Sequence, residues 1–518
     1  MSRIFRISLT LAVFFGLEKL LGSLRQVLIA RQFGLSPELD AFNAANNLPD
    51  LIFALISGGA LAIAFIPLLS EYLETKGQPA AWDLFSRVAN LVFLVTAGLS
   101  ILIAIFARQL VGWRVGISPG FAPTQQALVA DLKRLNLVAT LLFSLSGLVI
   151  AGLQANQHFF LPPLAPAMYD IGTLIGVLIL APESGYQLGS FQIPTLRMGI
   201  HGLVYGVILG SILFLGIQIP GLIRYRFHWT PAIDWKDPGV RKVITLLGPR
   251  VLTVFFIQMV FLAQDNLASG MAVGAVTALV YGWLIMQLPE TLIGTAIGTA
   301  LLPTLSEQIA RRETQAFLDS LNRTVQVILA VSLPAAVLLS LVLRPLVDIF
   351  GFDTAGSELV VWTARAFLAG LVGHSLLEVA VRSFYAQQDA RTPLLAPGLM
   401  FITFVIVALL LSPFLGPAGI ALANSMAFSA EAVLLLWLLN RQFQGLFKIG
   451  RAFVRVAAGT LLAGFIAYVI INGQILPGLL VLQEGLVSGV LHTAIAFAAG
   501  FLVILPFIWS EARMLIRL

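Results

Sequence analysis

Long apolar stretches, broken by short polar or Gly/Pro-rich segments, run along nearly the whole chain. Most are long enough to cross a bilayer, which takes roughly 20 apolar residues in a helix. The pattern predicts an all-α integral membrane protein with about fourteen transmembrane helices. The expected spans are 7–33, 41–72, 88–110, 126–153, 159–183, 199–223, 242–268, 274–308, 318–346, 357–387, 392–413, 417–440, 452–472 and 484–511. The second and eighth spans are long and contain Pro, so we expect them to be bent or tilted.

Composition narrows the class of function. The 518 residues are 58% hydrophobic and only 11% charged, against about 25% charged in a soluble domain. The absence of cysteine excludes disulfides, thiolate metal sites and cysteine nucleophiles. The five histidines are widely spaced, and the chain has no Walker A, G-x-S-x-G or H-E-x-x-H motif. We therefore expect a transporter, with no ATP hydrolysis and no enzyme activity.

The distribution of Lys and Arg predicts the orientation. With the N-terminus in the cytoplasm, cytoplasmic segments receive about three times as many Lys and Arg residues as exterior segments, which include Lys133 and Arg134. This bias predicts an even number of spans with both termini cytoplasmic. It accounts for the net charge of +6, so nucleic-acid binding is not expected. The basic N-terminus and the apolar run after it are interpreted as a retained first span.

The second half of the chain resembles the first at an offset of roughly 235 residues. The matching segments are 58–71 with 294–307, 155–157 with 386–388, and 162–166 with 393–397. Each copy holds an even number of helices, so the copies are parallel repeats that enter the membrane from the same side. We expect an N-lobe (1–230) and a C-lobe (231–445) around a central cavity, followed by two C-terminal helices (446–518).

The first span carries an arc of polar residues. Glu18, Lys19, Gly22, Arg25 and Gln26 lie within about a third of the helix circumference. A charge facing lipid at mid-depth costs at least about 2.5–3.5 kcal/mol. The arc must therefore face protein or a water-filled cavity, to which it gives a net positive lining. The alternative is a structural ion pair between Glu18 and Arg25.

Other spans also carry polar groups that need partners. In the second span Asp40 is a candidate helix cap, whereas Asn46 and Asn47 are amides in an otherwise apolar stretch. In the seventh span Arg250 and Asp265 share one face. Each of these positions is a candidate binding group.

In the tenth span Glu378 and Arg382 have the favourable order for an i,i+4 pair, and Arg365 lies further along.

Proline and glycine residues that weaken helical hydrogen bonding recur in both halves of the chain. They suit bending during transport or form static kinks. They are Pro49, Gly58, Gly59, Pro289 and Gly294.

Several segments, in this order, resemble a known family. They are Leu21 to Gly34, Asp40 to Asp50, Gly58 to Tyr72, Leu247 to Pro249, Leu267 to Ser269, Gly294 to Glu307, and Phe384 to Asp389 with Thr392-Pro393. They are similar to the MurJ (MviN) lipid II flippases of the multidrug/oligosaccharidyl-lipid/polysaccharide (MOP) exporter superfamily. The resemblance implies two lobes in a bacterial cytoplasmic membrane. It also implies a cationic cavity for the headgroup of undecaprenyl-linked peptidoglycan precursor.

The residue patterns above, together with the resemblance, predict roles for individual residues. The substrate-binding candidates are Lys19, Arg25, Arg31, Asp40, Asn46, Asn47, Arg250, Asp265 and Arg365. The gating or structural candidates are Glu18, Pro49, Gly58, Gly59, Pro289, Gly294, Glu378 and Arg382. The expected partners are a lipid-linked anionic substrate, membrane lipids and cell-wall synthesis proteins. No cofactor is expected beyond a coupling ion (Na⁺ or H⁺) or the membrane potential.

The chain also departs from the family pattern. Phe53 and Ala54 replace the family's basic pair, Leu284 stands at an arginine position, and 401–408 offers only Thr403 for a sodium-type site. Because diphosphate recognition depends on cations, the cargo has alternatives. These are another lipid-linked oligosaccharide, an amphipathic drug, or no cargo at all in a membrane scaffold.

Overall fold

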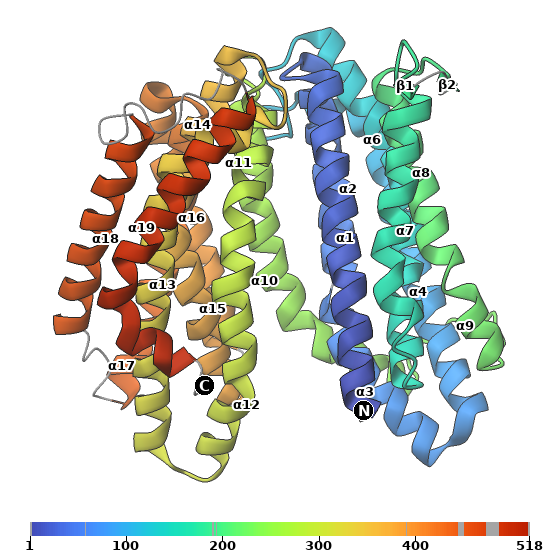
Figure 1. Cartoon of the computed structure of the whole chain (residues 1–518). Coiled ribbons are helices and arrows are strands. Elements are labelled where there is room, and N and C mark those ends of the chain that lie inside the picture. Colours follow the sequence, from blue (N-terminus) through green and yellow to red (C-terminus); the bar gives the residue numbers. More distant parts are fainter. Residues whose placement is uncertain are drawn as a thin grey trace. The chain divides into compact units, whose positions relative to one another are not determined.

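Helices make up nearly all of the computed structural model, which describes residues 3–56, 59–188, 191–192, 194–389, 391–443, 450–472 and 486–515. The all-α membrane fold is thereby confirmed. Contacts divide the chain into two compact units, Met1–Val273 and Gly274–Leu518 (Figure 1). Among the described residues, eleven helices are long and apolar enough to cross a membrane, or up to twelve with one bent pair. The count of fourteen stays a prediction.

The first unit is a bundle that extends from α1 to α10. Its elements are α1 (Arg3–Phe33), α2 (Pro37–Ile56), α3 (Gly59–Thr75), α4 (Gly77–Ile105), α5 (Ala107–Gly112), α6 (Pro123–Ala155), α7 (Leu161–Ile175), the π-helix η1 (Gly176–Leu180), β1 (Gln187–Leu188), β2 (Phe191–Gln192), α8 (Ile200–Gly216), α9 (Ile219–Arg224) and α10 (Pro238–Ala268). The two short strands pair antiparallel, with Gln187 opposite Gln192. Helix α6 is central, because it packs against α2, α3, α4 and α8.

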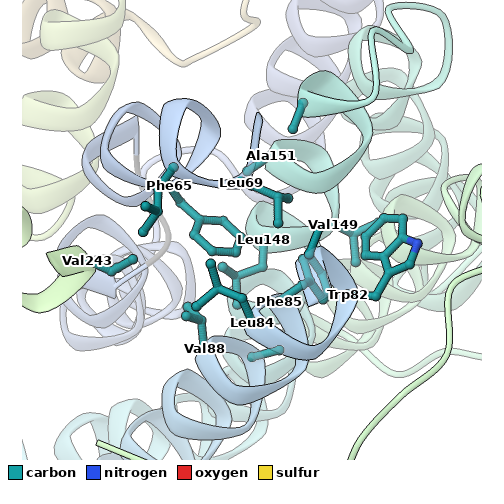
Figure 2. Close-up of a cluster of buried hydrophobic side chains, with 14 of the residues drawn as sticks. Phe65, Leu69, Trp82, Leu84, Phe85, Val88, Leu148, Val149, Ala151 and Val243 are labelled. Atoms are coloured by element: carbon teal, nitrogen blue, oxygen red, sulfur yellow. The ribbon is translucent and has the colours of Figure 1, made fainter. Parts of the chain in front are cut away.

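Part of the core of this unit lies between α3, α4 and α6 (Figure 2). Phe65 of α3, Trp82 and Phe85 of α4, and Leu148 of α6 are almost completely buried there. Small residues permit this packing: a Cβ added at Gly152 would lie 2.9 Å from the Phe85 ring. The close contact between α4 and α6 therefore depends on the sequence of both helices.

The second unit contains the remaining helices. They are α11 (Ala275–Glu290), the π-helix η2 (Thr291–Thr295), α12 (Ala296–Ala310), α13 (Thr314–Asp348), α14 (Thr354–Leu368), α15 (Leu371–Ala386), α16 (Thr392–Leu415), α17 (Pro417–Phe443), α18 (Gly450–Ile471) and α19 (Leu486–Leu515). Helices α16 and α17 pack along each other, while α18 and α19 pack together and against α13 (Figure 1).

Left-handed backbone positions repeat between the two halves in chain order. The pairs with positive φ are Gly34 and Gly274, Gly77 and Arg312, Gln157 and Gln388, and Gly199 and Gly416. Each pair lies at matching helix boundaries, which supports the internal repeat predicted from the sequence. By sequence α10 begins the second repeat, whereas its contacts place it in the first unit. The lobe boundary at residue 230 stays a prediction.

Two expected spans are interrupted. The second consists of α2 and α3, with Pro49 inside α2. The tenth expected span consists of α14 and α15, which meet at a bend of 41°. At that bend a Cβ on Gly370 would lie 2.6 Å from the Ser425 side chain, so the bend brings α17 close. Tertiary packing, which periodicity does not report, explains this break.

Candidate functional site

Arg25, the central cation of the polar arc on α1, is held by an acid from another helix. Its Nη1 donates to Asp170 Oδ1 on α7 at 2.7 Å, and Asp170 is almost completely buried. The guanidinium also lies over the Tyr169 ring, 5.2 Å from its centre. Gly22, one turn earlier on α1, leaves room for this contact, since a Cβ there would lie 3.6 Å from Asp170. The part of the arc that contains Gly22 and Arg25 therefore faces protein, one of the two expected surroundings.

The alternative pairing of Glu18 with Arg25 was wrong. Glu18 instead contacts its neighbour Lys19 at 3.4 Å, and the Lys19 side chain is 69% exposed. Arg31, in the last turn of α1, is also exposed. The reason is rotational: Arg25 points toward α7, where a buried carboxylate completes a stronger and better oriented pair.

Helix α2 carries a second group of polar residues. Asn46 Oδ1 accepts a hydrogen bond from Asn136 Nδ2 on α6 at 2.5 Å, and Asn47 Nδ2 donates to Asp265 on α10. Two predicted binding residues, Asn47 and Asp265, are thus brought together across α2 and α10. The suggestion that Asp40 caps α2 was wrong: it lies buried in the first turn, and the Ser36 hydroxyl accepts from the Leu39 N–H.

Lys133 is a buried cation that sequence reasoning missed. It was counted in an exterior segment, but it lies within α6 and is completely buried. Its ammonium donates to the backbone carbonyl of Ala45 at 3.0 Å and approaches that of Ala44 at 3.4 Å. Pro49 lacks the N–H that would bond to Ala45 four residues earlier. The proline kink therefore supplies the acceptor that holds Lys133 in place.

Asp170 and Asn136 were also missed, although each left a signal. Asp170 is the one carboxylate in the apolar span 159–183 before its C-terminal end. Lys133, Asn136 and Thr140 recur at i, i+3 and i+7, which places them on one face of a helix. Reading Lys133 as loop charge concealed that face.

The first unit therefore contains a polar cluster enclosed by membrane helices. Arg25 and Lys133 supply positive charge, and the carboxylates of Asp50, Asp170 and Asp265 supply negative charge. A cavity of about 340 Å³ lies beside them between α2, α6, α7 and α8. Such a cluster can bind ions or move charge, because buried charges require partners.

The second unit holds the other candidates. Glu378 and Arg382 form the expected ion pair on α15, and Arg382 Nη2 also donates to the Thr299 hydroxyl on α12 at 3.2 Å. Pro289 lies in the last turn of α11, just before η2 begins. Gly294 of η2 packs on α15, since a Cβ there would lie 2.7 Å from the Ser375 Cα. Gly294 is thus a close-packing position.

Arg365 lies apart from that ion pair. Its Nε donates to the Ser340 carbonyl on α13 at 3.0 Å, and it lines a cavity of about 540 Å³ between α13, α14, α15 and α18. Gly58 and the side chain of Arg250 fall outside the described residues, and Gly59 begins α3.

Residues 29–483 match the profile of the family described as "Lipid II flippase MurJ". The chain belongs to the MurJ family. This assignment places it among membrane transporters, in a family that is not one of catalytic enzymes. The match covers all of the second repeat and, apart from Arg25, the polar cluster of the first unit.

Named relatives of the MurJ family span most of the chain. The chain is 28% identical to the lipid II flippase MurJ of Burkholderia cenocepacia, covering 90% of both proteins. It is 30% identical to a probable lipid II flippase MurJ of Rhizobium meliloti, covering 81% of this chain and 77% of the relative.

Solved structures agree on the fold. A lipid II flippase MurJ in an inward closed conformation superposes with a TM-score of 0.78 and 22% identity, covering 98% of this chain and 99% of that one. An inward-facing multidrug resistance MATE transporter of the MOP superfamily gives 0.66 and 14%, covering 85% and 94%. The fold is therefore shared with both of these solved structures.

Proposed function

We propose that this protein is a flippase that carries undecaprenyl-linked peptidoglycan precursor, lipid II, across the bacterial cytoplasmic membrane by alternating access. Its membership of the MurJ family over nearly the whole chain carries this proposal. Both termini are cytoplasmic. An ion gradient or the membrane potential drives transport, and the lipid-linked anionic headgroup is the substrate.

The buried Arg25 gives this proposal a physical basis. Headgroup phosphates need a guanidinium that is oriented and shielded from water. Arg25 is 18% exposed and is oriented by Asp170 and Tyr169. Breaking the ion pair with Asp170 lets Arg25 turn to a diphosphate, which offers more oxygen acceptors and more negative charge.

Rescue of a bacterium depleted of its lipid II flippase tests the proposal. The wild-type chain restores growth, Arg25→Ala does not, and Arg25→Lys restores it partly, because lysine keeps the charge without the planar fork. Arg311→Ala is the matched control, since Arg311 is exposed and its one ion pair among the described residues is with Glu307, four residues earlier. Failure of a well-inserted wild-type chain to rescue growth contradicts the proposal.

A second candidate function is export of another lipid-linked oligosaccharide or an amphipathic drug. The observation that favours it is the apolar character of the wall where the family has basic residues. Phe53 lines the cavity of the first unit and packs edge-on against Phe143. Drug efflux without growth rescue supports this second function. A chain that shows neither growth rescue nor drug efflux supports a scaffold.

A further inference from the structure

The cavity of about 340 Å³ in the first unit is lined partly by side chains that carry oxygen atoms. Its polar lining residues are Asp50 and Asn46 of α2 and Asn136 and Thr140 of α6, and Tyr169 of α7 closes one side. The rest of the lining is apolar and aromatic, including Phe53 and Phe143. The volume has room for several water molecules.

Asp50 has no partner in the part of the chain that the structure describes. Its carboxylate makes no hydrogen bond and no ion pair there, and the exposed side chain lines the cavity from α2, inside the second expected span. Lys133, the buried cation nearby, is bound to backbone carbonyls and makes no ion pair within 4 Å with a described acid. An unpaired carboxylate that lines a cavity of this unit is available to a bound cation, in addition to the charge of Lys133 nearby.

Asn136 supplies an independent sign of a missing ligand. Its Oδ1 is buried and has no hydrogen-bond donor among the described residues. Its Nδ2 is already used on Asn46 Oδ1, and its backbone carbonyl accepts from the Thr140 hydroxyl at 3.1 Å. The Asn136 amide and the Thr140 hydroxyl thus donate within the wall, while oxygen lone pairs on Asn136, Asn46 and Thr140 stay available.

The charge and ligand type define the ion. One carboxylate with neutral amide and hydroxyl oxygens suits a hard monovalent cation. The described residues include no group of three or more His, Asp or Glu that could hold a metal ion, which argues against a divalent ion.

We propose that this cavity binds a sodium ion through Asp50, the amide oxygens of Asn136 and Asn46, and the Thr140 hydroxyl, with water completing its shell. The ion neutralises Asp50 beside Tyr169, whose ring also contacts the Arg25 guanidinium. Removing that negative charge strengthens binding of an anion at Arg25, so sodium and the anionic headgroup bind cooperatively. This coupling, unlike the ion site itself, rests on the proposed function.

Binding of radioactive sodium to the purified full chain in detergent tests the site. We expect saturable binding to the wild type, at least about tenfold weaker binding to Asp50→Asn, and a similar loss in Asn136→Leu. Asp50→Asn keeps the shape of the side chain and breaks no hydrogen bond among the described residues, so the fold is retained. Asp131→Asn, an exposed acid on α6 paired with Arg134, is the control and binds sodium as the wild type does.

Three results overturn the sodium site: no sodium binding by a folded wild type, unchanged binding by Asp50→Asn, or proton uptake at Asp50 in place of sodium. Flipping of lipid II in proteoliposomes, measured in NaCl and in choline chloride, separates the two proposals. Flipping without sodium binding overturns the site alone. Sodium binding without flipping of lipid II overturns the cargo alone.

Discussion

At the scale of single residues, the two cations of the polar cluster in the first unit, Arg25 and Lys133, each have an identified partner. Arg25 uses a carboxylate from α7, and Lys133 uses a carbonyl that Pro49 leaves without its helical donor. The gating role expected of Pro49 stays a prediction, but the kink also has this static function. Polar contacts inside the membrane helices are thus specific pairs between neighbouring helices.

Removing Asp170 should leave Arg25 as an uncompensated buried charge. Asp170→Ala is expected to destabilise the protein by about 3 kcal/mol, and Asp170→Asn by less, because an amide oxygen still accepts from the guanidinium. Thermal unfolding of purified variants measures both. The double variant with Arg25→Ala should recover at least about 1 kcal/mol of the loss, whereas strictly additive losses would show that the pair does not couple.

At the scale of elements, hydrogen bonds explain the segment Asp389 to Pro393, which the sequence analysis noted only as part of the family resemblance. Asp389 accepts hydrogen bonds from the N–H groups of Arg391 and Thr392 and from the Thr392 hydroxyl, just before α16 begins. The conformation of Gln388, with φ of 60°, turns the chain toward this cap, as Gln157 does before α7. The Asp-x-x-Thr-Pro pattern therefore starts a helix.

The cap gives a pH-dependent prediction. Partial burial alone would raise the pKa of Asp389, but hydrogen bonds from Thr392 and Arg391 and the charge of Arg391 bring it below its ordinary value. Since the folded pKa is depressed, the stabilisation is present above pH 4 or so and is lost as pH falls through the folded pKa. Asp389→Ala should therefore cost about 1 kcal/mol at pH 7.

Thermal unfolding of wild type and Asp389→Ala across pH checks this expectation. The difference in Tm should shrink as the pH falls below the ordinary value for aspartate. Asp319→Ala, on the surface of α13, is the control, because its carboxylate accepts only from the Gln315 side chain. A difference that stays constant down to acidic pH would exclude an ionised cap.

At the scale of the whole molecule, the even number of spans in each repeat links the repeats to the orientation in the membrane. Two parallel copies with an even number of spans, followed by two more helices, require both termini on one side. The Lys and Arg distribution selects the cytoplasmic side. The expected fourteen spans and the topology are therefore a single prediction.

The lack of native cysteine makes this prediction simple to test. Glu183→Cys, in the exposed segment after η1, should react with a membrane-impermeant maleimide in whole cells. Arg312→Cys, in the exposed turn after α12, should react only after the membrane is permeabilised. Labelling of Arg312→Cys in intact cells would show that the orientation is reversed or that the number of spans differs from the prediction.

The sequence by itself determined the membrane class, the helix positions and the repeat. These features depend on the length of apolar runs and on similarity between segments of the chain, and both can be read from the linear sequence. It also identified Arg25, Asn46, Asn47 and Asp265 as polar groups that needed partners, and it predicted the Glu378–Arg382 pair, because both residues lie on one helix.

Only the tertiary structure decided which residues on other helices are the partners of these polar groups. Arg25 meets Asp170 across 145 positions, and Asn47 meets Asp265 across 218. The burial of Lys133 and the unpaired Asp50 likewise depend on how α2 packs against α6. Helical rotation and packing select these contacts, and no local pattern reports them, because a polar residue on a helix shows only that some partner must exist.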